Sequence, residues 1–552
     1  MKGRRPGFTV FFVFFVALAA RALHVAFIRS HPYWALGDHW PNSDMNQYIA
    51  WARHLAAGDW LDLETFRAWF EWQAGIAPPE VWDSWFGAHV YYQPPLYTYF
   101  VALVIRFSDS FDLVRFLQIA IGAANAALVA LLGLRISGVT AARVAGLAAA
   151  IYAPWILYDA ELLRNAIAQF TQLLVLFALV SWHGAEPGRA RRLRAILAGC
   201  AFGVSWLADP VILLFAPLAS IWMMWAACDG KEGFAVRLEP VALFLAGAAV
   251  AVAPLVARNT TVGAPPLAIT TRGPLAFVMG NAPDAQPAGA VIPGSTPGIL
   301  NRSGYTMAGT MRETLRLYDG RYGQLLAHQW AKLEALWGAF EIPDNPSFYY
   351  AARISPVIGW GLRFPPVAAA GLVGLALMIL YGRDRPPAML VPVFLAASMG
   401  LFVLAHVVSR YRQPMVAALF IAAGHAVGWA LSRGWKGRAA VVSAAMVMGL
   451  ILPRGPAPGY GYNRPAEFIM VAKIHAMRGE TEPALEELDA SIKLARRETL
   501  FRPDIAVLHY EKGLIQADAG RPADAAASFR AALRENPSFE PAAMALREVS
   551  ER

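Results

Sequence analysis

The chain contains few charged residues and almost no cysteine. Asp, Glu, Lys and Arg make up 16% of its 552 residues, and the two cysteines are Cys200 and Cys228. Both cysteines lie within apolar runs, so we expect no disulfide framework. The sequence has no HExxH motif and no cysteine-rich spacing, so neither of these familiar metal signatures is present.

The chain is instead rich in long apolar runs. Hydrophobic residues reach 57% and the mean hydropathy is +0.41, a balance that is rare in soluble globular proteins. We therefore predict an all-α polytopic membrane protein of about eleven transmembrane helices. The predicted spans are residues 8–28, 113–134, 142–158, 164–182, 194–208, 210–227, 239–257, 364–381, 388–406, 413–431 and 438–453.

Basic residues gather in the short connections between these runs. The connections RISGVTAAR, HGAEPGRARRLR, DGKEGFAVR, GRDRPP and SRGWKGR all fall on one side if the N-terminal KGRR is cytoplasmic. This positive-inside pattern accounts for the net charge of +9, so we expect no nucleic-acid partner.

Two segments bear on this topology. The first run resembles a signal peptide with ALA as a cleavage site, but it is long enough to span, and we interpret it as an uncleaved helix. Residues 94–107 form a shorter run that would reverse the basic connections if it spanned, so we predict an interfacial or re-entrant helix there. Residues 29–112, 258–362 and 454–552 then lie on the outer side.

The last hundred residues are polar and helix-periodic. Within them, Gly479, Ala484 and Leu488 align with Gly520, Ala525 and Phe529 at a spacing of 41 residues. This self-similarity resembles a pair of tetratricopeptide (TPR) helix hairpins with a longer period than usual. Such a small solenoid must pack on something, and it would serve either as a structural cap or as a docking site for a protein partner.

Asp44 stands at the start of a predicted helix in the first outer segment. Ser43 or Asp44 suits the N-cap, and Gln47 is placed as in a capping box, so a helix cap is the plain structural interpretation of Asp44. Eight of the 18 tryptophans lie in the same outer segment. Their rings suit the membrane interface, and also sugar stacking. In that setting Asp44 is also a candidate reactive carboxylate.

Further ionisable residues stand at the outer boundary of the predicted spans, where each could simply end a helix or pair within a loop. Paired arginines at such a depth also suit a lipid phosphate, which they can bind in bidentate fashion. Asp209, next to Pro210, is interpreted as a turn residue. The boundary residues are Asp159, Glu161, Arg164, Arg258, Arg272, Arg410 and Arg412; Lys332 and Glu341 lie among aromatic residues farther along the second outer segment.

Taken in order, these segments resemble the GT-C glycosyltransferases. Within that superfamily they are similar to the branch of protein O-mannosyltransferases and the lipid A aminoarabinose transferase, often grouped as family 39. The resemblance covers about residues 8–430 and depends on order and topological side. The matching segments are SDMNQYIAWARHLAAGDW, QPPLYTYF, YDAELLRN, RNTTVG, RGPLAFVMGN, KLEALWGAFEIPDN and SRYRQPM.

The resemblance implies transfer of a hexosyl or pentosyl group from a polyprenyl-phosphate donor to an acceptor on the outer face, with inversion. Asp44 would be the general base, and Arg410, Arg412 and Arg258 would bind the donor phosphate. The protein would lie in a bacterial inner (cytoplasmic) membrane, with its active site and C-terminal region on the periplasmic side. Supporting or acceptor-site residues would be Asp159, Glu161, Arg164, Tyr92, Lys332 and Glu341.

One position departs from the family. Met45 follows Asp44, where the mannosyltransferase branch carries Asp-Glu. This difference weakens both a mannose-specific assignment and a paired-carboxylate metal site. We expect a reaction without cofactor or metal, although some superfamily members use a divalent cation. The sugar, and whether the acceptor is a protein, a glycan or a lipid, stay open.

Two other functions fit parts of the pattern. An O-antigen ligase or polymerase also combines many spans with a large outer loop, but places its key Arg and His late in the chain. A transporter or assembly scaffold would bury charges mid-span or break helices at corresponding places in two halves. Here the charges gather at the outer boundary, which favours an enzyme.

Overall fold

The computed structural model describes residues 6–551, apart from positions 68, 88, 228–233, 383–384, 456–460, 463 and 498–501. Cys228 lies outside the described residues, and Cys200 is a free thiol. All regular elements of the described residues are helices. In addition, one isolated β-bridge pairs Tyr152 with Leu362. The all-α prediction is therefore confirmed.

The helices fall into four groups: a main bundle, two loop regions and a tail. The main bundle contains α1 (Pro6–Ile28), α7 (Phe111–Ser137), α8 (Val139–Ala150), α9 (Ala153–Ala160), α10 (Asn165–His183), α11 (Arg189–Ala208), η2 (Pro210–Leu214), α12 (Phe215–Ala226), α13 (Phe234–Thr261), α20 (Phe364–Tyr381), α21 (Pro386–Leu404), η3 (Ser409–Arg412), α22 (Gln413–Ser432) and α23 (Gly434–Ile451). The first loop region contains η1 (Pro32–Ala35), α2 (Leu36–His39), α3 (Asp44–Ala56), α4 (Glu71–Ala74), α5 (Pro79–Phe86) and α6 (Pro95–Ser108). The second contains α14 (Gly273–Asn281), α15 (Thr296–Ser303), α16 (Met307–Arg316), α17 (Tyr322–Trp337), α18 (Phe348–Ile354) and α19 (Pro356–Trp360).

The tail forms the fourth group, which we call the C-terminal unit. Its helices are α24 (Pro465–Met477), α25 (Thr481–Ala495), α26 (Arg502–Asp518), α27 (Pro522–Glu535) and α28 (Glu540–Glu551). The aligned glycines Gly479 and Gly520 both adopt positive φ, at 77° and 72°, in the turns of the two helix hairpins. The hairpins are therefore present as predicted, whereas their assignment to the TPR family stays a prediction.

Seven helices within the described residues are long and apolar enough to cross a membrane. They are Gly7–Ile28, Phe111–Ser137, Asn165–His183, Val236–Thr261, Phe364–Tyr381, Pro386–Leu404 and Ser409–Ser432. The other four predicted spans are helical too, but α8 and α12 are short, α11 begins with four arginines within six residues, and α23 is less apolar. The count of eleven stays a prediction.

The predicted span 142–158 is broken in the structure. α8 ends at Ala150 and α9 starts at Ala153, with Pro154 in its first turn. The backbone groups freed at the break pair with a distant segment, because Ala153 N donates to Leu362 O at 2.9 Å and Leu362 N donates to Ile151 O at 3.0 Å. The predicted interfacial segment 94–107 is the helix α6.

Small residues let the bundle helices touch backbone to backbone. A Cβ on Gly199 of α11 would lie 1.9 Å from the Phe244 carbonyl oxygen of α13, and one on Gly247 would lie 2.1 Å from the Ile196 oxygen. Only glycine allows this approach, which is a common way for membrane helices to associate.

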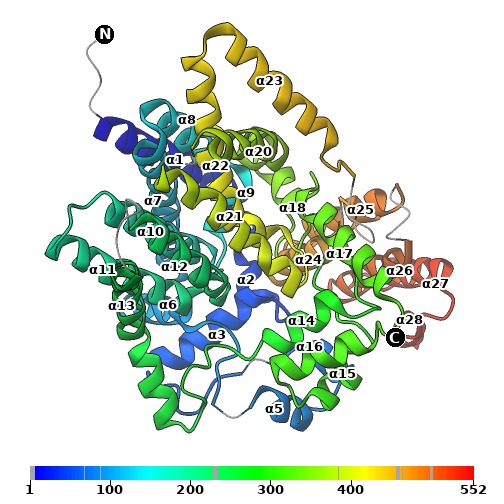
Figure 1. Cartoon of the computed structure of the whole chain (residues 1–552). Helices are drawn as coiled ribbons and strands as arrows, with labels where there is room; N and C mark the ends of the chain where they lie inside the picture. Colours follow the sequence, from blue (N-terminus) through cyan, green and yellow to red (C-terminus); the bar gives the residue numbers. More distant parts are fainter. Residues whose placement is uncertain are drawn as a thin grey trace.

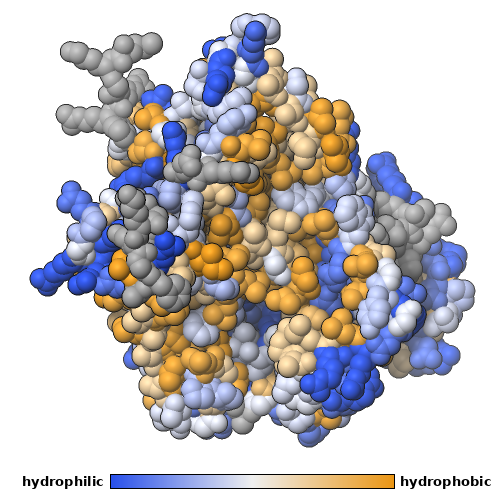
Figure 2. Space-filling view, viewed as in Figure 1, coloured by the Kyte–Doolittle hydropathy of each residue, from blue (hydrophilic) through white to orange (hydrophobic). Residues whose placement is uncertain are grey.

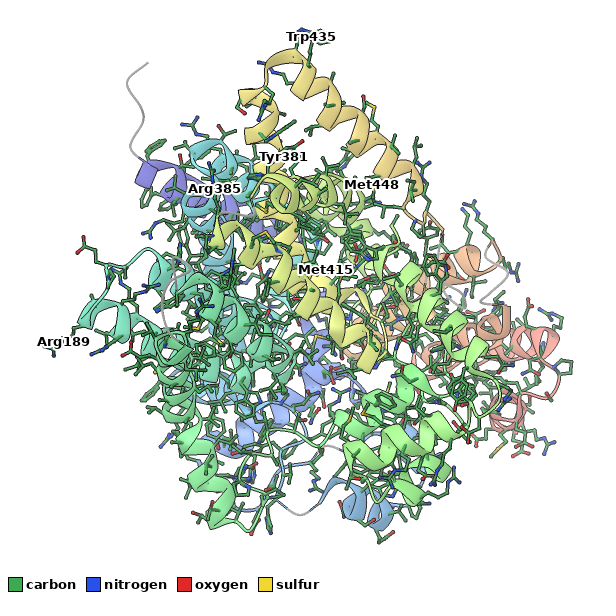
Figure 3. The ribbon with its side chains drawn as sticks, viewed as in Figure 1. Arg189, Tyr381, Arg385, Met415, Trp435 and Met448 are labelled. Carbon is green, nitrogen blue, oxygen red and sulfur yellow. The ribbon has the colours of Figure 1, made fainter. Side chains whose placement is uncertain are left out.

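The loop regions and the C-terminal unit gather at one end of the bundle. In Figure 1 the turn between α22 and α23 lies at the top, whereas α3, α5 and α14–α16 lie at the bottom and the C-terminal unit lies at the right. In Figure 3, Met415 of the first turn of α22 lies near the centre of the view, and Trp435, at the start of α23, lies at the top. Figure 2 shows apolar side chains over the helices at the centre and left of this face, and hydrophilic ones over the C-terminal unit.

Candidate active site

Asp44 is the first residue of α3, and its side chain does not cap that helix. Ser43 is the N-cap, since its hydroxyl accepts from Asn46 N at 3.1 Å. The capping interpretation therefore applies to Ser43, and both carboxylate oxygens of Asp44 are left for contacts with other elements.

Four side chains from distant parts of the chain converge on the Asp44 carboxylate. Arg410 Nη2 lies 2.5 Å from Oδ2, and Arg272 Nη1 lies 3.3 Å from Oδ1. Gln93 Nε2 donates to Oδ1 at 3.0 Å, and Asn345 Nδ2 donates to Oδ2 at 3.2 Å. The Asn345 side chain also accepts from Asp44 N at 2.6 Å, so it holds both the carboxylate and the helix start.

Further charged side chains extend this arrangement. Arg164 donates to the oxygen of Gln93 at 2.9 Å and faces Asp209 at 3.7 Å, while Arg410 Nε pairs with Asp344. Three arginines thus face three aspartates, so their formal charges balance. We call these residues the Asp44 cluster: Asp44, Gln93, Arg164, Asp209, Arg272, Asp344, Asn345 and Arg410.

A cavity of about 310 Å³ opens beside the Asp44 cluster. One side is polar and is lined by Gln93, Arg164, Asp209, Arg272, His406 and Tyr411. The rest is apolar and is lined mainly by Val211, Leu213, Leu214, Ala276, Met307, Leu401 and Leu404. The side chains of Arg272 and Arg164 retain 23% and 17% of their exposure, against 6% for Arg410, so they are the cations most accessible to a ligand.

The end of α14 shapes this cavity. A Cβ on Gly280 would lie 2.3 Å from the carbonyl carbon of Ala405, so α14 touches the backbone next to His406. Burial, followed by the charges of Arg272, Arg410 and Lys332, lowers the pKa of His406 to about 3. His406 is therefore neutral at physiological pH and adds no charge to the cavity.

The arginines also set the charge state of Asp44. Burial alone would raise the pKa of Asp44, because it removes water from the carboxylate. Arg410 and Arg272 outweigh burial and hold the pKa of Asp44 well below its ordinary value. The carboxylate is ionised at any physiological pH, and it is a weak base as long as both arginines contact it.

Among the residues predicted from the sequence, Arg410 and Arg164 join Asp44 in this cluster. Tyr92 lies at its edge, with its ring 5.2 Å from the Arg272 guanidinium carbon. Their functional roles stay predictions.

Arg258 and Arg412 were predicted to bind the donor phosphate, and both instead hold loop backbone. Arg258 donates to the carbonyl oxygens of Leu61, Asp62 and His89. Arg412 pairs with Glu341 at 2.6 Å and donates to the Gly338 carbonyl at 2.7 Å; its side chain is 1% exposed. Neither guanidinium contacts Asp44 in the structure.

The predicted acids Asp159 and Glu161 also lie in other contacts. Asp159 forms a buried ion pair with Arg21 at 2.7 Å. A Cβ at Gly122 would lie 2.1 Å from its carboxylate oxygen, so that glycine makes room for the pair. Burial raises the pKa of Glu161 to about 7, and its charged neighbour is Arg115.

Lys332 is buried in α17 and donates to Asn281 Oδ1 at 3.1 Å. Burial lowers the pKa of Lys332 to about 7. Its charge acts on His406, and its hydrogen bond goes to Asn281 and not to Asp44.

Besides Asp209, which was interpreted as a turn residue, four members of the Asp44 cluster were not proposed as site residues from the sequence: Gln93, Arg272, Asp344 and Asn345. All four lie in segments that the family resemblance had marked, namely QPPLYTYF, RGPLAFVMGN and KLEALWGAFEIPDN. The signal was therefore present in the segments, but it did not say which side chains face Asp44.

Among the described residues, one group of side chains is close enough together to hold a metal ion: His54, Asp59 and Asp62, at the end of α3 and in the loop after it. His54 Nε2 lies 3.4 Å from Asp59 Oδ2 and 3.5 Å from Asp62 Oδ1. Both carboxylates also accept backbone N–H groups of residues 63–66, so they order this loop as well. The expectation of a metal-independent reaction stays a prediction.

No family model matches the chain, and no curated protein matches it. Among solved structures, it is similar to the oligosaccharyltransferase of Archaeoglobus fulgidus. The apo form gives 14% identity and a TM-score of 0.42 over 79% of this chain, and the complex with zinc and sulfate gives 16% and 0.43 over 79%. The complex with an inhibitory peptide and a dolichol-phosphate gives 13% and 0.42 over 84%.

This likeness is distant and partial. The chain spans 54%, 51% and 58% of the three oligosaccharyltransferase chains, or about half of their length. The function proposed below therefore rests on the geometry of the Asp44 cluster and its cavity.

Proposed function

We propose that the protein is an integral-membrane glycosyltransferase of the GT-C type, which moves a sugar from a polyprenyl-phosphate donor to an acceptor on the outer face of the membrane. One observation carries the proposal: a carboxylate held by two arginines adjoins a cavity with cations at one side and leucines at the other. A single-chain amphiphile with an anionic head matches that lining.

The donor would lie with its phosphate at Arg272 and Arg164. These two guanidinium groups line the cavity and keep unused N–H donors, which suit the oxygens of a phosphate. The prenyl chain would run along Leu213, Leu214 and Leu401, at the ends of η2 and α21. Lipid from the surrounding bilayer would complete that apolar wall.

Asp44 would act as the general base. An acceptor hydroxyl oxygen forms the new bond to the anomeric carbon, while the bond from that carbon to the phosphate oxygen breaks. The hydroxyl proton passes to Asp44, and the departing lipid phosphate gains the negative charge that the arginines stabilise. Attack from the side opposite the phosphate inverts the anomeric configuration.

Donor binding would also activate Asp44. In the free protein Arg410 and Arg272 hold the pKa of Asp44 low, which weakens it as a base. A phosphate at Arg272 shares that cation and adds a negative charge nearby, and both effects raise the pKa of a carboxylate. The base would thus gain strength only when the donor is in place.

The remaining assignments are part of the same proposal. The protein would lie in a bacterial inner membrane, with the Asp44 cluster and the C-terminal unit on the periplasmic side. The acceptor would be a glycan, a lipid or a protein, and a protein partner could dock on the C-terminal unit. No metal would take part.

The test is a donor panel with purified full-length protein. Polyprenyl phosphates carrying different hexoses and pentoses are supplied singly in detergent or liposomes, and release of polyprenyl phosphate is measured. We expect release with at least one donor. Asp38→Asn, a change in an outer aspartate that pairs with Arg53 at 3.6 Å, should leave that release intact. No release with any donor, with or without added acceptors, would contradict the proposal.

A further inference from the structure

Among the described residues, Arg464 joins the C-terminal unit to the Asp44 cluster by hydrogen bonds. Arg464, the residue before α24, donates from Nη1 to the Asp344 carbonyl at 2.8 Å and from Nη2 to the Asn345 carbonyl. The same side chain pairs with Glu467, which is fully buried, and lies over the Trp40 ring at 5.2 Å. One guanidinium group thus joins α24, the turn at 344–345 and the loop before α3.

The two residues whose carbonyls Arg464 holds are those whose side chains reach the reaction centre. The Asp344 carboxylate pairs with Arg410, and the Asn345 amide exchanges two hydrogen bonds with Asp44. The carbonyl group and the Cα atom of a residue lie in one planar peptide unit. The hydrogen bonds to these two carbonyls therefore also fix the Cα atoms from which the Asp344 and Asn345 side chains extend.

Neighbouring contacts hold α24 in this position. The Phe468 ring meets the Tyr350 ring edge-on at 4.9 Å, and the Arg353 guanidinium lies 5.1 Å from the Phe468 ring centre. The Tyr350 hydroxyl also donates to Glu487 of α25 at 3.3 Å. Tyr350 and Arg353 belong to α18, which follows the 344–345 turn closely. The C-terminal unit therefore contacts both the turn itself, through Arg464, and the helix after it, through Phe468.

We infer that the C-terminal unit completes the active site, with Arg464 as a positioning residue that orients Asp44 and Arg410 through the 344–345 turn. The inference rests on the proposed function, because it assigns Arg464 a part in that reaction. The unit is then more than a cap or a docking module: loss of its contact with the turn slows the chemical step.

The first test compares Arg464→Gln with wild type in the full chain, using the donor that the panel identifies. A displacement of about 1 Å at a reacting group costs roughly a hundredfold in rate. We expect kcat to fall at least about tenfold with little change in KM for the donor. Asn345→Ala should do the same, and the double variant should be no slower than the worse single one, because both changes break one chain of contacts.

Arg521→Gln is the matched control. Arg521 belongs to the same unit and forms ion pairs with Glu482 and Asp524 far from the turn, so kcat should not change. Arg464→Lys keeps the charge toward Glu467 but lacks the forked donor, so it should recover only part of the lost rate. It also serves as the test variant if Arg464→Gln does not accumulate as folded protein.

Hydrogen–deuterium exchange gives a readout that does not need activity. Arg464→Gln should speed exchange in peptides covering 341–348 and 41–48, while Arg521→Gln should leave both unchanged. Unchanged exchange at these peptides, or an unchanged kcat in a folded Arg464 variant, overturns the inference. Absence of wild-type activity with every donor contradicts the proposed function instead, and the exchange data then decide the coupling alone.

Discussion

Asp44 and Asn345 exchange two hydrogen bonds although 301 residues separate them in sequence. The amide oxygen of Asn345 accepts the first free N–H of α3, and its Nδ2 donates to the carboxylate. The helix start and the carboxylate are therefore fixed together by one side chain. This contact defines the orientation in which Asp44 faces Arg272, Arg410 and the cavity.

Arg272 should contribute to donor binding more than to folding. Arg272→Gln removes one guanidinium from the polar side of the cavity, and a hydrogen bond to a charged group contributes about 1.5–3 kcal/mol. We expect KM for the donor to rise about 10–100-fold, measured by initial rates of lipid-phosphate release. Arg302→Gln, a change in an exposed arginine that pairs with Glu313 and does not line the cavity, is the control and should leave KM unchanged.

The pH profile should separate the free protein from the donor complex. Because the pKa of Asp44 lies well below its ordinary value of 3.8, kcat/KM should not fall through loss of this base on acidification to about pH 4. The acid limb of kcat should lie at higher pH, since bound donor phosphate raises the pKa of Asp44. Arg410→Gln should move both limbs upward. Identical limbs for kcat and kcat/KM would contradict activation by the donor.

Asp159 should prove to be a structural residue. Asp159→Asn leaves Arg21 buried without its countercharge, a loss that costs about 3–5 kcal/mol. We expect a clearly lower unfolding temperature and an unchanged rate per folded molecule. The double change Arg21→Met with Asp159→Leu removes both charges and should recover part of the stability.

The control for this pair is Asp524→Asn, which breaks an exposed pair with Arg521 and should cost less than about 1 kcal/mol. A reaction rate that falls for Asp159→Asn at full stability would return Asp159 to the active site.

Lys332 should lower stability in a pH-dependent way. Its pKa is about 7 in the folded protein and 10.5 when exposed, so the unfolded chain binds the extra proton between these values. The cost of burying the amine is full below about pH 7 and disappears as the pH rises toward 10.5. Lys332→Met should therefore raise the unfolding temperature at pH 6.5 more than at pH 9.5. Asn281 keeps a donor in Gln329, so its oxygen stays paired. An equal gain at both pH values would point to packing instead of charge.

The sequence was sufficient to predict the helical membrane fold, because apolar runs and basic connections report it directly. Its topology also placed Asp44 and Arg410 on the same side of the membrane, whereas their direct contact is known only from the structure. It could not show that span 142–158 breaks at Tyr152, because the break is stabilised by pairing with Leu362, which lies far along the chain.

The site was only partly predictable for a similar reason. Arg410 and Arg412 are two residues apart and look equivalent in sequence, yet one faces Asp44 and the other Glu341. Their difference comes from η3, the short helical turn between α21 and α22, which turns the two side chains in different directions. The tail's contact with the site through Arg464 depends on tertiary packing, which no local pattern reports.

The most direct test of the whole account is the rate of Asp44→Asn. This change keeps the size of the side chain but removes the base, so lipid-phosphate release coupled to sugar transfer should fall by about 10²–10⁴-fold, with the unfolding temperature close to wild type. Asp38→Asn, measured alongside, should retain the wild-type rate. A folded Asp44→Asn protein that transfers sugar as fast as wild type would contradict the assignment of Asp44 as the general base and, with it, the proposed mechanism.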